Sequence, residues 1–93
     1  MIREFEIVDY DPEKELQYPW LEKALAECYM DKKYHFAVIN GNTEGLECLA
    51  VAFLTLAQKS VPEGASLYFS TEDANHPLQY GSLKVVKKLK WEE

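Results

Sequence analysis

The sequence predicts an α/β fold of the two-layer α+β kind, in which two helices pack on a four-stranded mixed sheet in the order β-α-β-α-β-β. Three observations predict it: short segments of alternating apolar residues, two segments where apolar residues recur every three or four positions, and turns with proline or glycine between them. The 93 residues, 47% of them hydrophobic, suffice for one core and are too few for two. We therefore expect a single domain over residues 1–93.

The first strand and the first helix are predicted in the N-terminal third of the chain. Residues 2–8 alternate as in a half-buried strand. The connection 9–19 ends at Pro19, which suits the first position of a helix. Apolar residues then recur at helical intervals and predict an amphipathic helix over about 19–30; they are Trp20, Leu21, Ala24, Leu25, Cys28 and Tyr29.

A second strand and a second helix follow. Residues 34–39 are aromatic and β-branched on both faces, which predicts a central strand covered on both sides. Asn42 or Thr43 is the expected N-cap of a helix over 43–58. That helix is apolar nearly all round and needs cover on more than one face. A second subunit would supply such cover, so a homodimer through the apolar helix 43–58 is an open alternative.

The last two strands are predicted at residues 65–70 and 82–91, on either side of a polar loop. A loop of this length favours antiparallel pairing between them. The two earlier crossovers through helices imply some parallel pairing elsewhere. The expected sheet is therefore mixed.

Reactive side chains show no arrangement typical of a catalytic or metal site. His35 and His76 each lack a second histidine or a carboxylate at ligand spacing. Cys28 and Cys48 lie in predicted helices and are expected to be reduced core thiols. Residues 41–45 open a helix after a strand, but no Gly-Lys-Ser/Thr follows as a phosphate loop requires. We expect no enzyme activity, no metal and no cofactor.

The charge distribution points to a basic partner. Residues 1–31 hold nine acids and three bases, whereas residues 32–93 hold seven of each, so the net charge of −6 arises in the first third. This works against nucleic acid as a partner, because phosphate binding needs a basic patch. The basic residues near the C-terminus lie on a predicted strand, where lysine commonly guards an open edge: Lys84, Lys87, Lys88 and Lys90.

The sequence gives no indication of a membrane protein. No apolar run reaches the roughly 20 residues of a membrane-spanning helix. The first ten residues are charged where a signal peptide would be apolar. We therefore expect a cytoplasmic protein with no membrane partner.

Acidic residues beside aromatic ones form the candidate partner-binding surface. Aromatic side chains supply much of the affinity in protein interfaces, while charge speeds the encounter. One patch lies in the first connection and a second in the loop before the last strand; they comprise Asp9, Tyr10, Asp11, Glu13, Glu15 and Trp20, and Glu72 with Asp73. The other interpretation is a solvated connection whose aromatic residues pack on the core.

From Phe36 onward the chain contains the segments FAVINGNTEGLECLA, AQKSVPEG, SLYF and GSLKVV, with characteristic residues at Gly41, Asn42, Gly45, Leu46, Leu49, Pro62, Gly64, Gly81 and Ser82. In these segments it resembles the bacterial immunity proteins of family 32 in polymorphic toxin systems. The family often has histidine and aspartate in its third strand, where this sequence has Tyr68, Phe69 and Ser70. The resemblance implies an immunity protein that binds and neutralises a cognate toxin, often a nuclease, by covering its basic surface.

Two other classes of function are weighed against this one. A non-catalytic homo-oligomeric scaffold or regulatory module would use the apolar second helix as a dimer core and have no toxin partner. A small-molecule binder would need a concave pocket with convergent polar groups, and the sequence predicts none. A toxin gene beside this one would favour the immunity protein.

Overall fold

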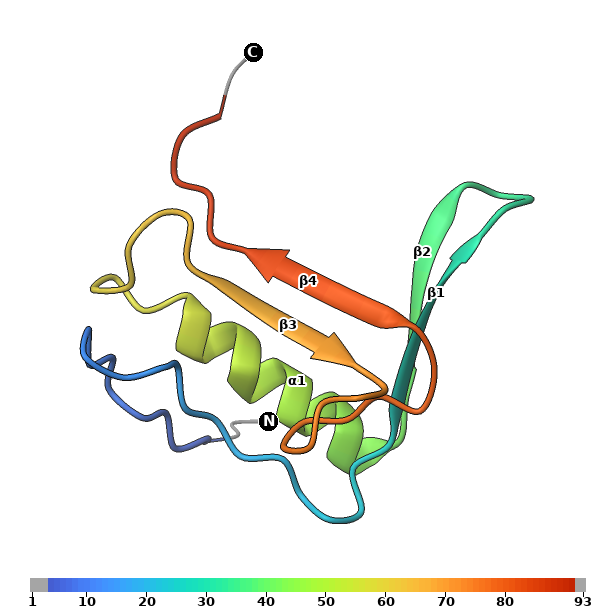
Figure 1. The fold of residues 1–93 in the computed structure, drawn as a ribbon, viewed down its shortest axis with the longest axis horizontal. Helices are drawn as coiled ribbons and strands as arrows, with labels where there is room; N and C mark the ends of the chain where they lie inside the picture. The colour runs from blue at the N-terminus through green and yellow to red at the C-terminus, as the bar shows by residue number, and fades with distance from the viewer. Residues whose placement is uncertain (1–3, 92–93) are drawn as a thin grey trace.

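The computed structural model describes residues 4–91 and contains, within them, one helix and two separate two-stranded sheets (Figure 1). The elements are β1 (Ala26–Asp31), β2 (Phe36–Gly41), α1 (Thr43–Leu56), β3 (Ser66–Ser70) and β4 (Ser82–Val86). β1 pairs with β2 and β3 with β4, both antiparallel. The predicted four-stranded mixed sheet with two helices is therefore wrong, whereas the antiparallel pairing of the last two strands is confirmed.

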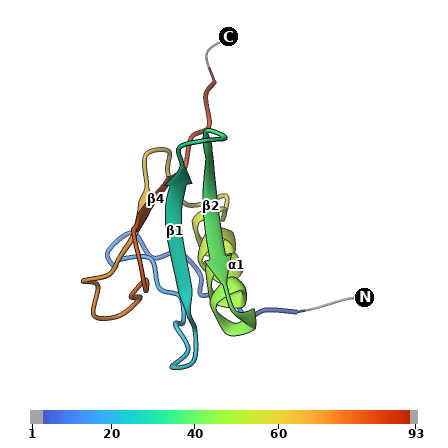
Figure 2. The same cartoon turned by 90° about the vertical axis from the view of Figure 1, so that its right-hand side faces the viewer.

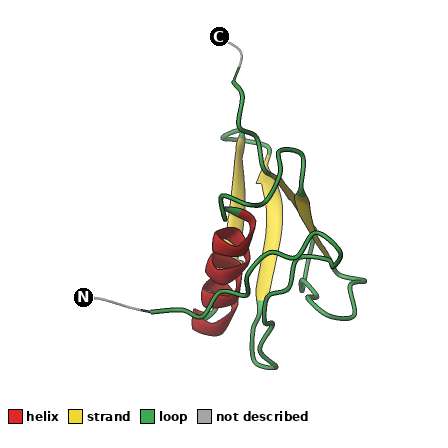
Figure 3. Cartoon of the chain, turned by 90° about the vertical axis from the view of Figure 1, so that its left-hand side faces the viewer, coloured by secondary structure: helices red, strands yellow, loops and turns green. Residues whose placement is uncertain are grey.

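The core lies between α1 and one face of the β3–β4 hairpin, and Figure 3 shows the helix on one side of the strands. β3 alternates: Leu67 and Phe69 are buried, while Ser66 and Tyr68 point outward. Phe69 is 0% exposed, and full burial of such a side chain contributes about 1.5–3 kcal/mol. The buried residues of α1 include Cys48, Leu49, Val51, Ala52, Thr55 and Leu56.

Helix α1 confirms the predicted second helix, and Asn42 explains where it begins. The Asn42 side chain is the N-cap and accepts a hydrogen bond from the Gly45 N–H at 2.7 Å. Its Oδ1 also accepts from the Leu25 N–H at 3.0 Å, and its Nδ2 donates to the Lys23 carbonyl at 2.8 Å. One side chain thus ties the N-terminal segment to the start of the helix.

The predicted helix over 19–30 is wrong, because residues 26–31 form strand β1. A period of two competes there with the helical period: Ala24, Ala26 and Cys28 are all buried. Leu21 and Leu25, which the helical pattern placed in the core, are each 48% exposed. Pairing with β2 satisfies the backbone in this extended form.

The turn between β1 and β2 explains why two strands meet where a helix and a strand were expected. Asp31 Oδ1 accepts hydrogen bonds from the N–H groups of Lys33 and Tyr34, and the Asp31 carbonyl accepts from His35. His35 takes the left-handed conformation at φ 60° in a turn that contains no glycine. Such a turn lacks the glycine signal by which hairpins are usually recognised in sequences.

β2 is an edge strand, so its predicted position as a central strand covered on both sides is wrong. Phe36 is 49% and Ile39 40% exposed. The far half of the β1–β2 hairpin extends away from the core, as Figure 2 shows from the side. Apolar side chains on both faces here reflect an open surface rather than two covering layers.

The predicted first strand at 2–8 is also wrong for its described part, since residues 4–10 form no strand; residues 2 and 3 lie outside the described range. Gln58 holds this segment instead: its Oε1 accepts from the Tyr10 N–H at 3.0 Å and its Nε2 donates to the Val8 carbonyl at 2.9 Å. Alternation alone does not make a strand, because a strand needs a paired edge.

One isolated β-bridge joins the two hairpins within residues 4–91. Glu27 and Tyr80 form an isolated parallel bridge, with the Cys28 N–H donating to the Tyr80 carbonyl at 3.0 Å. Beyond this bridge β1 and β4 diverge (Figure 1). The parallel pairing expected from the crossovers is therefore reduced to one residue pair within residues 4–91. Both cysteines are free and buried, Cys28 in β1 and Cys48 in α1.

Candidate functional site: an acidic groove beside strand β3

A groove runs along the edge of β3 that does not face β4. The N-terminal segment forms one wall, β3 the other, and the loop 71–80 closes one end. Its volume of about 430 Å³ falls in the range of ligand and peptide sites. We call it the acidic groove; it is lined by Glu15, Leu16, Tyr18, Ala65, Ser66, Leu67, Tyr68, Asp73, Asn75 and His76.

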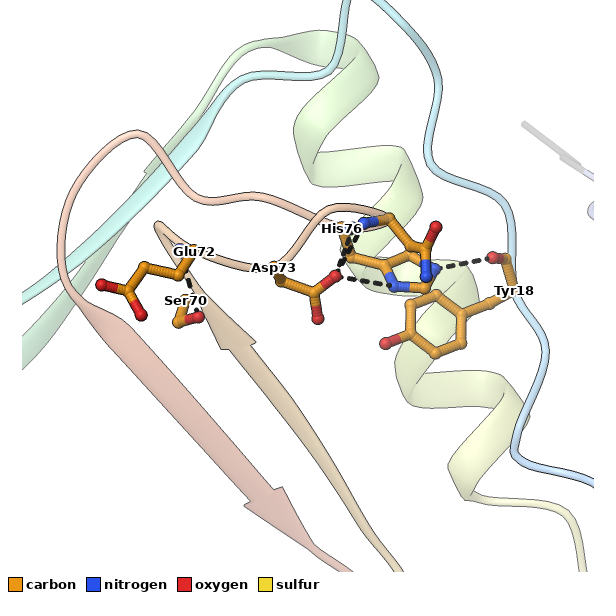
Figure 4. A network of polar contacts seen from close by, with 6 residues as sticks. Tyr18, Ser70, Glu72, Asp73 and His76 are labelled. Atoms are coloured by element: carbon orange, nitrogen blue, oxygen red, sulfur yellow. Dashed lines mark hydrogen bonds and ion pairs between the residues drawn. The ribbon is translucent and has the colours of Figure 1, made fainter.

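Asp73 organises the loop that closes the groove (Figure 4). Its Oδ1 accepts hydrogen bonds from the N–H groups of Asn75 at 2.8 Å and His76 at 3.0 Å. These backbone donors hold the pKa of the Asp73 carboxyl below its ordinary value, and the nearby His76 ring adds to the effect. Asp73 therefore stays negatively charged at neutral pH.

His76 joins this loop to the N-terminal segment. Its ring stacks on the Tyr18 ring with centroids 4.2 Å apart (Figure 4). His76 Nε2 lies 3.2 Å from the Tyr18 carbonyl oxygen, and its Nδ1 lies 3.9 Å from Asp73 Oδ1. Two segments far apart in the sequence are thus held side by side.

The pKa of Tyr18 depends on burial and on the negative charges in the groove. Burial raises the pKa of Tyr18, the negative charges of Asp73 and Glu15 act in the same direction, and together they bring it to about 12. Glu15, Tyr18 and Asp73 line the same groove, although Glu15 belongs to the N-terminal segment and Asp73 to the loop. The groove is therefore negative at its N-terminal wall and at the end that the loop closes.

The chain has no significant match among protein-family models, curated proteins or solved structures. The resemblance to immunity proteins accordingly stays a prediction. Across residues 4–91, no three His, Cys, Asp or Glu side chains are grouped so as to hold a metal ion. In the same range no helix has both the length and the apolar character to cross a membrane.

The structure brings together one acid from each predicted patch. Glu15 and Asp73 both line the acidic groove. Asp9 and Asp11 lie beside it, in a smaller pocket that also contacts Thr55 of α1. Glu13 and Glu72 are exposed and line neither.

The two aromatic residues predicted for partner binding both contact the core. Tyr10 and Trp20 are half-buried and pack against the core cluster. Trp20 lies 5.8 Å from Phe69 between ring centroids, and its Nε1 is buried without a hydrogen-bond partner among the described residues. Their apolar surface is thus largely used in folding.

Three aromatic residues of the groove, Tyr18, Tyr68 and His76, were not among the predicted site residues. Tyr68 is 57% exposed on the outer side of β3, and alternation within SLYFS would have placed it there once Leu67 and Phe69 were assigned to the core. The sequence predicts His76 only as an isolated loop histidine. No sequence signal indicates that it stacks on Tyr18, because that contact depends on the tertiary fold.

Proposed function

We propose that this chain is a non-catalytic inhibitor that binds a basic protein through the acidic groove. The observation that carries the proposal is the convergence of Glu15 and Asp73 on Tyr18, which makes one negative surface from two distant segments. The exposed Tyr68 ring beside these acids is the kind of side chain that anchors protein interfaces.

The partner in this proposal is a cognate toxin domain, as the sequence resemblance implies. A toxin that acts on nucleic acid needs a basic active-site surface to hold phosphates. An acidic inhibitor that covers this surface blocks access, and its field speeds association. An inhibitor of this kind would act in the cytoplasm of the cell that makes the toxin.

Association kinetics with the toxin domain encoded by a neighbouring gene test the proposal. Glu15→Lys should slow association at low salt by about fivefold or more, because steering depends on local charge. Glu22→Lys is the matched control, since Glu22 is exposed and lies outside the groove. Equal effects of the two changes would show that only net charge matters and would overturn the groove as the site. Failure of the protein to suppress the toxin's lethality would overturn the function.

A homo-oligomeric scaffold is the second candidate, favoured by the outer face of α1. Leu46, Phe53 and Leu54 are exposed on one side of this helix, with Ala50 among them. A monomeric protein rarely exposes such a continuous apolar stripe. Sedimentation equilibrium of the wild type and of Leu54→Glu tests it: a dimer that the substitution dissociates supports the scaffold, and a monomeric wild type argues against it.

A further inference from the structure

β3 has a paired edge and an open edge, and a β-bulge fixes which backbone groups face each. Gly64 N–H donates to the Lys87 carbonyl at 2.9 Å, and Lys87 N–H donates to the Ala65 carbonyl at 2.8 Å. Gly64 and Ala65 therefore both lie opposite Lys87, with Gly64 at φ 92°. From Ala65 onward alternate residues, Leu67 and Phe69, direct their N–H and C=O groups toward β4.

The residues between them direct their backbone groups to the open edge. These are Ser66, Tyr68 and Ser70. The Ser70 carbonyl is already used, since it accepts from the Leu78 N–H at 2.9 Å. In the part of the chain that the structure describes, the outward N–H and C=O groups of Ser66 and Tyr68 have no hydrogen-bond partner. Both residues line the acidic groove, so the groove contains an unpaired strand edge.

An extended segment beside β3 would satisfy these groups. A strand added at the usual spacing of about 4.8 Å pairs its backbone with Ser66 and Tyr68. Its side chains would alternate between the groove floor and the outer face, where Tyr68 stands opposite Lys84. Basic side chains on such a segment would meet Glu15 at the N-terminal wall and Asp73 at the closed end of the groove.

The charges beside the open edge of β3 indicate which kind of molecule binds there. β3 contains neither lysine nor proline, the residues that commonly block an open edge, whereas β4 carries Lys84. A second copy of this chain, docked through the same edge, would bring the Glu15 and Asp73 carboxylates of both copies together. Like charges disfavour that pairing. A basic segment from another protein meets the opposite charge.

We propose that β3 binds an extended basic segment of the partner protein as an added strand, so that the β3–β4 hairpin becomes a three-stranded sheet. The identity of the partner rests on the proposed function, whereas the binding of a strand at the β3 edge is tested separately. Backbone pairing supplies part of the affinity, and Glu15 and Asp73 select for positive charge.

The first test uses a synthetic eight-residue peptide of alternating arginine and valine. Two further forms carry N-methyl groups on the odd or on the even residues, which removes the N–H donors of one edge and leaves the charge unchanged. We expect the unmodified peptide to shift the amide resonances of Ser66 and Tyr68. One methylated form should bind about tenfold more weakly, as the loss of two hydrogen bonds predicts, and the other should bind like the parent.

The second test changes the protein. Ser66→Pro removes an outward N–H without touching the bonds to β4, a position where edge strands tolerate proline. It should weaken peptide binding about fivefold or more by loss of a hydrogen bond and steric block, whereas Ser66→Ala should leave it unchanged. Amide spectra of Leu67 and Phe69 report whether the hairpin remains intact in both variants.

The outcomes separate this inference from the proposed function. Equal binding of the two methylated forms, or no binding of the parent peptide at low salt, overturns strand addition. If Glu15→Lys still slows toxin association in that case, the acidic groove stands as a surface that binds without pairing. If the methylated forms differ but no toxin partner binds, strand addition is supported and the inhibitor function is overturned.

Discussion

The Cys28 carbonyl oxygen lies against the backbone of Gly81, so closely that a Cβ at position 81 would come within 1.8 Å of it. Gly81 also has φ 79°, a conformation that other residues rarely adopt. This contact joins the β1–β2 hairpin to the start of β4, next to the bridge between Glu27 and Tyr80. No side chain fits at this junction.

Gly81→Ala should therefore lower the free energy of unfolding by about 3 kcal/mol or more, since steric overlap with backbone adds to the conformational strain. Urea denaturation measures it. Gly64→Ala is the control, because Gly64 has φ 92° but nothing within 4 Å of its ideal Cβ. Gly64→Ala should lower the free energy of unfolding by only about 1 kcal/mol. Equal losses at the two positions would contradict the close contact.

Trp20→Phe should leave the free energy of unfolding within about 0.5 kcal/mol of the wild type, or raise it, because it removes a buried donor that has no acceptor among residues 4–91. The Phe ring keeps the contact with Phe69. Trp20→Ala is the comparison and should lose about 2 kcal/mol or more of packing. A large loss in Trp20→Phe would show that the indole N–H is hydrogen-bonded in solution.

Asp73 should make the protein sensitive to acid. Its pKa is lower in the folded chain than its ordinary 3.8, so its stabilising effect is present above that value and is lost as the pH falls through the folded pKa. Asp73→Asn should cost about 1 kcal/mol at neutral pH through weaker capping of the loop and should converge with the wild type in acid. Urea denaturation from about pH 7 to about pH 2 measures the difference. Glu72 is the exposed neighbour of Asp73. Its substitution Glu72→Gln should show no such dependence of stability on pH.

The Tyr18 phenol should lose its proton at a higher pH than an ordinary tyrosine does. Its pKa is about 12 when folded against 10.0 normally, so folding favours the neutral phenol; this stabilisation is complete below pH 10 and disappears as the pH rises to about 12. Phenolate absorbance should show a late step that Tyr18→Phe removes. Asp73→Asn should move that step to lower pH, though not to 10, because burial is the larger cause. A step unchanged in Tyr18→Phe would assign it to another tyrosine.

Local signals predicted the elements whose structure is set locally. α1 has its own N-cap in Asn42, and β3 alternates in and out around Leu67 and Phe69. β1 could not be assigned in this way, because its sequence fits a helical and an extended period equally, and pairing with β2 decides between them. Residues 4–8 alternate just as well, yet they pair with no strand and are not extended into one.

The acidic groove was predictable only in part. The excess of acids in the N-terminal third identified Glu15, and the polar loop identified Asp73. Their meeting beside Tyr18 depends on the stacking of His76, which links segments far apart in the chain. The backbone edge of β3 has no sequence signature, since any residue type provides the same N–H and C=O groups.

Gly64 and Ala65 both lie opposite Lys87, so the turn before β3 should be unusually sensitive to the gain or loss of a residue. Turns at a protein surface usually tolerate gain or loss of a residue. Here a deletion at Gly64 has two outcomes: the bulge is lost and the turn must close with one residue fewer, or the following strand shifts by one position, which sends Leu67 and Phe69 into water and Tyr68 inward. Homologous chains should accordingly differ at this turn by residue type rather than by residue number.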